Sequence, residues 1–438
     1  MSQLADFQPI LPDTAAANEE GHLVLGGCDL VELAEEFGTP LYIFDEATLR
    51  NACRMFRREF EERYPDSLVL YACKAFICRA LAQIFKEEGL GLDVVSGGEI
   101  YLAHLVDFPR EKVYFHGNNK TAEELELALN WGVGRIVVDN FSEITLLEQL
   151  ARQAGRVQEV LLRISPGIDP HTHEFLATGV VDSKFGFPLP QAKEAVGEVL
   201  ESSNLKLIGL HAHLGSLIHD YVPYQEALRV MLGLVAEVRD DFGLELEELN
   251  LGGGFAVQYT RGAPVLSVAE FAAAITSTLR GLVKELSLPT LRLVVEPGRS
   301  IVGRAGVALY RVGSLKDIPG IRKYVSLDGG LGDNPRPALY GARYEALAAN
   351  KLGEEEVEEV TLAGRFCESG DILIKDVKLP RLEPGDLIAL PVSGAYNLPL
   401  ASNYNLCPRP AVVLVHEGQA RLIRHRETYE DLLRLDLP

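Results

Sequence analysis

The chain has 438 residues, 47% of them hydrophobic and 24% charged, which is an ordinary composition for a soluble globular protein of about two or three domains. Asp and Glu number 63 against 42 Lys and Arg, so the net charge is -21, and neither nucleic acid nor a membrane surface is expected as a partner. The six cysteines form no CxxC pair, and no signal peptide or bilayer-spanning apolar run is visible, which favours a cytoplasmic protein.

The pattern of residues 1–40 predicts a short N-terminal segment that contains one strand and one helix. His22–Leu25 is a strand candidate, Asp29–Phe37 is a short helix candidate, and Gly38-Thr39-Pro40 ends that helix. We expect this segment to pack with the β-rich C-terminal part of the chain, whose sheet the N-terminal strand can return to join.

Residues 41–310 alternate strand and helix signals. Eight apolar strand-like runs occur at 68–74, 91–96, 113–116, 136–140, 161–163, 207–213, 249–254 and 293–299. Helix patterns cover 46–64, 122–131, 143–154, 224–241 and 268–286, and four of them follow the capping residues Asp45, Thr121, Ser142 and Ser267. Eight βα units predict an α/β fold with a (β/α)8 TIM-like barrel, whose active site lies where the strands end.

Residues 311–438 predict a C-terminal all-β domain. The runs 323–327, 357–362, 371–374, 386–390 and 410–415 are short, β-rich and separated by Gly, Pro and charged turns.

Three features at the ends of the predicted barrel strands suggest catalytic or ligand-binding roles. Lys74 follows an apolar run, where desolvation would lower its pKa and leave a neutral amine able to condense with a carbonyl. Glu296 could hold a pyridinium nitrogen protonated, and Gly252-Gly253-Gly254 could bring backbone N–H groups to a phosphate. Taken singly, each has a plainer interpretation: solvated side chains for Lys74 and Glu296, and a tight turn for the glycines.

Two His-x-His pairs raise the possibility of a metal. His171 and His173, like His211 and His213, could direct two imidazoles to one zinc ion. Such a site needs further ligands at matching strand ends, and a phosphate-binding glycine turn does not suit it. We therefore expect no metal, with His213 available to stack on a flat cofactor ring.

Longer motifs appear in order along the chain. The barrel part contains Tyr71-Ala-Cys-Lys-Ala75, Gly91-Leu-Asp-Val-Val-Ser-Gly-Gly-Glu99, His116-Gly-Asn-Asn-Lys120, Asp182-Ser-Lys-Phe-Gly186, His211-Ala-His-Leu-Gly-Ser216, Gly252-Gly-Gly-Phe255 and Glu296-Pro-Gly-Arg299. The C-terminal part contains Asp328-Gly-Gly-Leu-Gly-Asp-Asn-Pro-Arg336, then Pro337-Ala-Leu-Tyr340, Cys367-Glu-Ser-Gly-Asp371 and Gly394-Ala-Tyr396. From about residue 38 to 420 the chain resembles the diaminopimelate decarboxylase family of alanine-racemase-like pyridoxal phosphate enzymes.

The resemblance implies pyridoxal 5'-phosphate as the cofactor. It places the covalent attachment at Lys74, a ring-stacking role at His213 and the partner of the ring nitrogen at Glu296. Further cofactor-binding positions are Asp93, Ser216, Gly253, Gly254, Gly298, Arg299 and Tyr396.

The resemblance also implies how an amino-acid substrate is read. Arg299, Arg336 and Tyr340, with Tyr396 nearby, would bind the distal carboxylate, and Glu368 would bind the distal ammonium. Cys367 would protonate the carbanion, so the expected catalytic set is Lys74, Cys367, Glu296 and His213. In this family the Cys367–Glu368 segment reaches the partner's barrel, which implies a homodimer with shared active sites.

The expected reaction is decarboxylation of meso-2,6-diaminopimelate to L-lysine and CO2. A related decarboxylase of carboxynorspermidine or ornithine, a non-catalytic pyridoxal-binding regulatory homologue and a zinc-dependent barrel hydrolase remain alternatives. Two departures from the family pattern, at Phe76 and at Asn397-Leu-Pro-Leu400, concern the fit of the substrate rather than the class of reaction.

Overall fold

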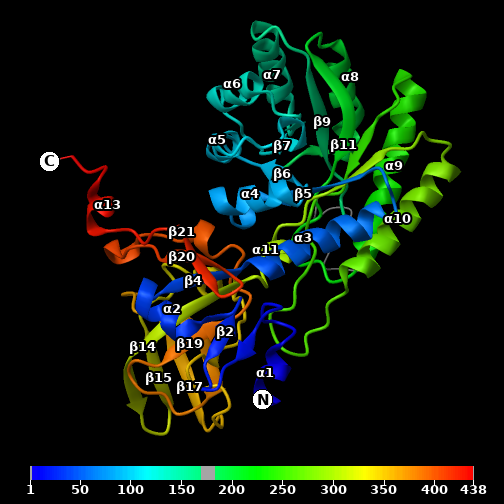
Figure 1. The fold of residues 1–438 in the computed structure, drawn as a ribbon. Helices are drawn as coiled ribbons and strands as arrows, with labels where there is room; N and C mark the ends of the chain where they lie inside the picture. Colours follow the sequence, from blue (N-terminus) through cyan, green and yellow to red (C-terminus); the bar gives the residue numbers. More distant parts are fainter. Residues whose placement is uncertain (1, 169–182, 438) are drawn as a thin grey trace. The chain divides into compact units, whose positions relative to one another are not determined.

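The computed structural model describes residues 2–168 and 183–437. The chain forms two compact units, which Figure 1 traces by colour along the sequence. One unit consists of Cys53–Ala256 and Val265–Gly298; the other consists of the chain up to Ala52, Val257–Pro264 and the chain from Arg299 onward.

The first unit is a closed parallel barrel, as expected. Its strands are β5 (Ser67–Ala72), β6 (Gly91–Val94), β7 (Val113–Phe115), β8 (Arg135–Val138), β9 (Gln158–Ser165), β11 (Leu205–His211), β12 (Glu248–Asn250) and β13 (Arg292–Val295). Each strand pairs in parallel with the next, and the pairs β8–β9 and β13–β5 close the ring. The short β10 (Phe187–Pro188) adds to β9.

Helices connect the barrel strands. They are α4 (Arg79–Glu87), α5 (Gly97–Leu105), α6 (Ala122–Trp131), α7 (Phe141–Gln153), α8 (Ala192–Glu201), α9 (Val222–Phe242) and α10 (Val268–Glu285). The barrel interior is filled by Leu70, Tyr114, Val137, Leu161, Ile208 and Val294, one from each of six strands. A filled interior keeps chemistry at the strand ends rather than inside the barrel.

The predicted helix caps are largely correct. Asp45 accepts the Thr48 N–H at the start of α3 (Glu46–Glu61), and Thr121 and Ser267 form capping boxes on α6 and α10. Ser142 is wrong as a cap: α7 begins at Phe141, two residues before the predicted start at 143, and the Asn140 side chain accepts the Glu143 N–H. An asparagine caps a helix as well as a serine does, so both positions carried the signal.

The second unit is built on a β-sheet. Its order is β18 (Ile372–Leu379), β17 (Glu358–Ala363), β15 (Arg322–Leu327), β14 (Gly306–Ile318), β4 (Leu41–Asp45), β20 (Ala411–His416) and β21 (Gln419–Arg424). β19 (Leu387–Leu390) pairs with β14 and with β16 (Leu347–Ala348). The short helices are α11 (Arg299–Val302), α12 (Arg336–Tyr340) and α13 (Tyr429–Leu433).

The N-terminal segment packs on this β unit. It contains α1 (Ser2–Phe7), β1 (Ala16–Ala17), β2 (Leu23–Leu25), β3 (Cys28–Asp29) and α2 (Leu30–Phe37). β1–β3 form a small sheet of their own, and Leu23 and Leu25 share a core with Val307 and Val413.

The predicted boundaries of the barrel, at residues 41 and 310, are wrong. The strand near the N-terminus that joins the large sheet of the β unit is β4, which the prediction assigned to the barrel. All five residues of β4 are buried, and the strand pairs antiparallel with β14 and parallel with β20. β14 begins at Gly306, so the boundary at 310 falls inside a strand. An apolar run of five residues has no periodicity that tells a barrel strand from a central strand of another sheet.

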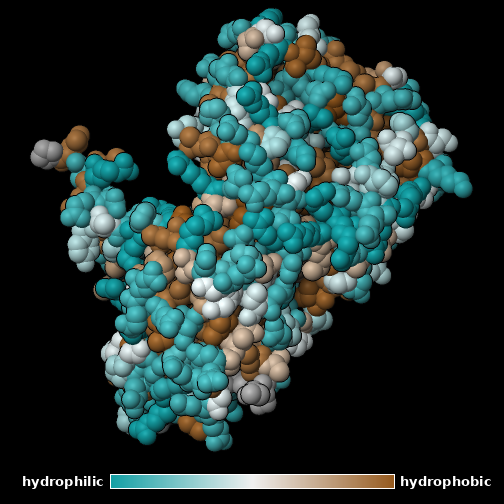
Figure 2. Space-filling view, in the orientation of Figure 1, coloured by the Kyte–Doolittle hydropathy of each residue, from teal (hydrophilic) through white to brown (hydrophobic). Residues whose placement is uncertain are grey.

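Apolar side chains are exposed where the chain ends. Leu433, Leu435 and Leu437 follow β21 in and after α13, and Figure 2 shows brown atoms at the C-terminal end of the chain. Among the described residues, no helix is both long enough and apolar enough to cross a bilayer.

Candidate active site

The carboxyl ends of the barrel strands surround a cavity of about 450 Å³. Residues from six strand ends line it: Lys74 after β5, Asp93 in β6, His116 after β7, Arg163 in β9, His211 and His213 at β11, and Glu296 after β13. Because parallel strands all end on the same face of a barrel, positions far apart in sequence meet here.

Lys74 reaches this cavity from a turn rather than from the strand itself. β5 ends at Ala72, and Lys74 is the middle residue of the 3₁₀ turn Cys73–Ala75. Its side chain is exposed, whereas its neighbours Cys73 and Ala75 are buried. The expectation that the strand end desolvates Lys74 is therefore wrong, because the turn carries the residue past the buried end of β5.

Glu296 is a buried carboxylate held by three side chains. It is 4% exposed and directly follows β13. His116 Nε2 lies 3.0 Å from Oε1, His211 Nε2 lies 3.3 Å from Oε2, and Asn250 Nδ2 donates to Oε1 at 2.7 Å. Although burial alone would raise the pKa of Glu296, His116 and His211 hold this pKa well below its usual value. The cavity therefore contains a fixed negative charge.

The two histidines of the His211–His213 pair have different surroundings. Burial lowers the pKa of His211 to about 4, so this imidazole is neutral at pH 7. Burial also lowers the pKa of His213, whose Nδ1 accepts the Gly253 N–H at 3.2 Å. A ring nitrogen that accepts a hydrogen bond is unprotonated, so His213 presents a neutral flat ring to the cavity.

Asp93 supplies a second buried carboxylate. Its Oδ1 lies 3.7 Å from His116 Nε2 and has no hydrogen-bond partner among the described residues. Burial raises the pKa of Asp93, and the nearby His116 opposes this only in part. A buried polar atom without a hydrogen-bond partner lowers the stability of the fold, and such atoms are typical of sites where a bound ligand supplies the partner.

The glycine turn after β12 leaves no room for side chains. Gly252 and Gly254 have φ of +68° and +106°, which favour glycine. A Cβ on Gly253 would lie 2.2 Å from the Glu296 carbonyl oxygen, and one on Gly254 would lie 2.7 Å from the Gly215 carbonyl oxygen. The turn thus brings backbone against backbone beside the exposed Ser216.

Gly298 also has no room for a side chain, because a Cβ there would lie about 3.1 Å from Ala75 Cβ in the turn that carries Lys74.

The barrel residues fit pyridoxal phosphate. An amine and a carboxylate line one cavity, a flat neutral imidazole lies at the end of a strand, and a glycine turn is suited to a phosphate.

The residues that lie close enough together to bind a metal differ from the His-x-His pairs considered from the sequence. Nitrogen and oxygen atoms of His116, His211 and Glu296 all lie within 4.8 Å of one another, and His213 is not in that group. His171, His173 and Asp182 lie outside the described residues.

Arg336 is a buried cation in the β unit, at the first position of α12, and it is 4% exposed. Its Nη1 donates to the hydroxyls of Tyr259 at 2.8 Å and Tyr344 at 2.5 Å. In the part of the chain that the structure describes, no carboxylate forms an ion pair with Arg336. A buried guanidinium without a carboxylate is a ready partner for an anionic ligand.

Arg299 shares one of these tyrosines. Its Nη1 donates to the Tyr259 hydroxyl at 2.6 Å, and its guanidinium lies 4.5 Å from the ring centre of Tyr396. Tyr396 has φ of +63°, an uncommon backbone conformation for a residue with a side chain. The structure therefore brings Arg299 and Arg336 together at Tyr259, a residue that the sequence motifs did not indicate, and places Tyr396 against Arg299.

The other predicted substrate residues of this unit are exposed. Tyr340, at the end of α12, is 69% exposed. Cys367 and Glu368 are exposed in the turn before β18, where the Cys367 N–H donates to Asn405 Oδ1 at 2.9 Å and the Tyr404 hydroxyl donates to the Cys367 carbonyl at 3.2 Å. The backbone of this turn is thus anchored while its side chains face outward.

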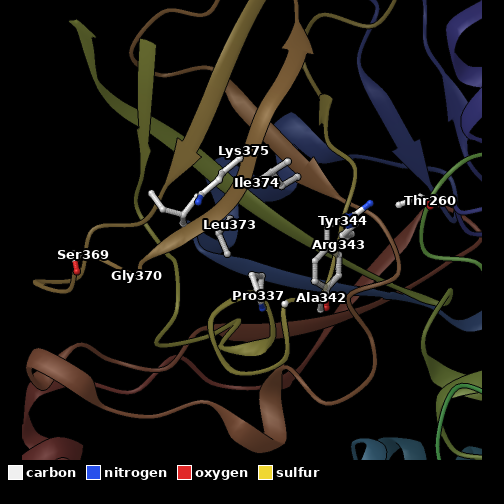
Figure 3. Close-up of a pocket in the computed structure, with 12 residues that line it drawn as sticks. Thr260, Pro337, Ala342, Arg343, Tyr344, Ser369, Gly370, Leu373, Ile374 and Lys375 are labelled. Carbon is white, nitrogen blue, oxygen red and sulfur yellow. The ribbon is translucent and has the colours of Figure 1, made fainter. Parts of the chain in front are cut away.

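A second cavity, of about 620 Å³, lies within the β unit (Figure 3). Pro337, Arg343 and Tyr344 line one part of it, and Ser369 and Lys375 line another. Apart from Thr260, its lining residues follow Arg336 or Glu368 in the sequence.

Sequence reasoning assigned no role to His116, Asn250, Arg163 or Tyr259. The first three lie in or just after strands β7, β12 and β9, so their position at a strand end was a signal that could have indicated them. Tyr259 lies in the loop 257–264, which carries no such signal.

Comparisons with known proteins cover nearly the whole chain. Residues 46–303 match the family model of the pyridoxal binding domain of pyridoxal-dependent decarboxylases. The diaminopimelate decarboxylase of Bacillus subtilis is 47% identical over 98% of both chains, and that of Mycobacterium tuberculosis H37Rv is 41% identical over 100% of both.

Solved structures give the same result. The diaminopimelate decarboxylase of M. jannaschii in co-complex with L-lysine has a TM-score of 0.92 and 35% identity, covering 97% of this chain and 98% of that one. The Helicobacter pylori diaminopimelate decarboxylase complexed with L-lysine has a TM-score of 0.84 and 32% identity, covering 93% and 99%.

Proposed function

This chain belongs to the diaminopimelate decarboxylases within the pyridoxal-dependent decarboxylase family, and from this premise we propose that it converts meso-2,6-diaminopimelate to L-lysine and CO2. The observation that carries the choice of substrate is the buried Arg336, which has no carboxylate partner among the described residues. Ornithine has only the carboxylate that is lost, whereas diaminopimelate has a second one for this guanidinium to bind bidentately.

The barrel residues would hold the cofactor. Lys74 supplies the amine that binds it covalently, Glu296 supplies the negative charge that keeps a ring nitrogen protonated, and His213 supplies the flat ring that packs against it. Asp93, Ser216, Gly253, Gly254 and Gly298 are the further proposed contacts in the barrel, and Arg299 and Tyr396 are those in the β unit. When bound, pyridoxal phosphate accepts the electron pair that remains on the substrate when CO2 leaves.

The β unit would hold the substrate and return the proton. Arg336, assisted by Arg299, Tyr340 and Tyr396, binds the distal carboxylate, and the exposed Glu368 accepts hydrogen bonds from the distal ammonium. Cys367, next to Glu368, delivers the proton that replaces CO2 on the α-carbon. Binding both ends of the distal head group orients the substrate so that the correct carboxylate is lost.

The active unit in this proposal is a homodimer with shared sites. Cys367 and Glu368 are exposed, and so are Leu339, Tyr404 and Leu406, which supports an interface on the β unit. We also propose a cytoplasmic location, which the six cysteines support because none forms a disulfide.

The test is turnover of two substrates by the enzyme loaded with pyridoxal phosphate. CO2 and L-lysine should form from meso-diaminopimelate, with little CO2 from ornithine. Arg336→Ala should lower kcat/KM for diaminopimelate at least about tenfold, the effect of losing a hydrogen bond to a charged group, and should leave the weak ornithine activity unchanged.

An equal loss on both substrates would contradict the assignment of Arg336. Release of CO2 from ornithine or carboxynorspermidine, and not from diaminopimelate, would favour a related decarboxylase. Pyridoxal phosphate binding without any turnover would favour a regulatory homologue.

A further inference from the structure

A chain of buried hydrogen bonds leads away from Arg336 inside the β unit. Arg336 Nη1 donates to the Tyr344 hydroxyl at 2.5 Å, and that hydroxyl donates to Asn397 Oδ1 at 3.0 Å. Tyr344 is buried and Asn397 is 0% exposed. Both partners of the Tyr344 hydroxyl are therefore shielded from water, which makes these contacts strong and their loss costly.

The direction of these bonds follows from the number of protons. A guanidinium only donates, so the Tyr344 hydroxyl must accept from Arg336. A hydroxyl has one proton, and the Asn397 carbonyl oxygen takes it. Burial raises the pKa of Tyr344, so that proton stays in place at neutral pH. With its proton committed to Asn397, the hydroxyl keeps a lone pair directed at Arg336.

Asn397 is itself held from two sides. The preceding residue, Tyr396, has the uncommon φ of +63°. The Nδ2 atom of Asn397 lies 3.5 Å from the Tyr42 hydroxyl. Tyr42 in turn donates to the Asp333 carbonyl oxygen at 3.0 Å. Asp333 lies three residues before Arg336, so the hydrogen bonds return to the segment from which they started.

We propose that Tyr344 and Asn397 are positioning residues that hold the Arg336 guanidinium in the orientation that binds the distal carboxylate. This inference rests on the proposed function, because it takes Arg336 as the carboxylate-binding residue. Asn397 acts through Tyr344: it fixes the hydroxyl, and the hydroxyl fixes Arg336. It also gives a role to one position where the chain departs from the family pattern.

The experiment measures kcat and KM for meso-diaminopimelate in Tyr344→Phe, Asn397→Ala and the double variant. Tyr344→Phe should raise KM about tenfold with kcat nearly unchanged, since it removes one hydrogen bond to a charged group. Asn397→Ala should raise KM severalfold. The double variant should match Tyr344→Phe, because the other route from Asn397, through Tyr42, ends on the backbone of Asp333 and not on the Arg336 guanidinium.

The matched control is Tyr324→Phe, which deletes a hydroxyl on β15 in the same unit, and its KM should equal that of the wild type. A lower kcat with unchanged KM, or multiplicative KM effects in the double variant, would overturn the positioning role. If Asn397→Ala does not fold, Tyr344→Phe alone still decides, because an unchanged KM in it contradicts the proposal.

The two proposals fail in different ways. A wild-type enzyme inactive on diaminopimelate refutes the proposed function. A wild type that is active and sensitive to Arg336→Ala, but insensitive to Tyr344→Phe, refutes only the positioning role.

Discussion

At the scale of single residues, the barrel cavity places a charged carboxylate close to the neutral imidazoles of His211 and His213. Glu296 keeps its charge although it is buried, because His116, His211 and Asn250 each contact an oxygen of its carboxylate. A charge fixed before the cofactor binds needs no rearrangement to act on it, and such preorganised charge is a main source of catalytic power. The exposed Lys74, by contrast, reaches the cavity on a short turn.

Lys74→Ala should cut turnover by orders of magnitude, because alanine has no amine with which to bind the cofactor covalently. The variant should also lose the visible absorption band of the attached cofactor, although pyridoxal phosphate can still bind through the glycine turn. The control is Lys206→Ala, since Lys206 is the second residue of β11, at the end of the strand opposite His211, and pairs with Glu159 and Glu247. Near-normal turnover in Lys74→Ala would refute the cofactor chemistry.

Asp333 predicts a measurable pH dependence of stability. Burial raises its pKa from 3.8 to about 6, against the hydrogen bonds from Tyr310 and Gly330. Between those two pH values the folded protein holds a proton that the unfolded chain releases, so the contribution of Asp333 to stability is full below pH 3.8 and is lost as the pH rises through about 6.

Urea unfolding of wild type and Asp333→Asn should therefore converge as the pH rises. The advantage of the wild type should shrink by about 1.4 kcal/mol per pH unit between pH 4.5 and 6, and then stay constant. A difference between the two proteins that does not change with pH would show that Asp333 is ionised in both states.

At the scale of elements, strand ends were the informative signal. Seven of the eight ionisable residues that line the barrel cavity lie in apolar runs visible in the sequence, because parallel strands must end on one face. The partners of Glu296 could not be assigned that way, since the register that brings His116 and Asn250 to one carboxylate depends on closure of the whole ring. The pairing of β4 with β14 and β20 is equally non-local, so its apolar run alone did not assign it to the β unit.

At the scale of the whole molecule, the residues named in the proposed function belong to two different units of the chain. Lys74 and Glu296 belong to the barrel unit, whereas Arg336, Cys367 and Glu368 belong to the β unit. The family motifs indicated the residues of both units, because each motif is a short segment that carries its own functional side chains. Which chain's β unit serves which barrel depends on assembly, and that leads to a test with mixed subunits.

Mixing two inactive variants under conditions of subunit exchange should restore activity if sites are shared. Lys74→Ala damages the barrel and Cys367→Ala damages the β unit. In a two-fold heterodimer of shared sites, one site then carries both lesions and the other carries neither. Random exchange of equal amounts makes half of the dimers mixed, so about a quarter of wild-type activity should return.

The control pairs Lys74→Ala with Glu296→Ala, two lesions in the barrel. Because every site of that heterodimer contains one damaged barrel, no activity should return even though exchange is complete. Native mass spectrometry measures exchange in both mixtures, so an absent recovery cannot be mistaken for absent mixing. If the Lys74→Ala and Cys367→Ala mixture exchanges fully and stays inactive, each Cys367 serves the lysine of its own chain, because only then does every site in the mixture lack one of the two residues.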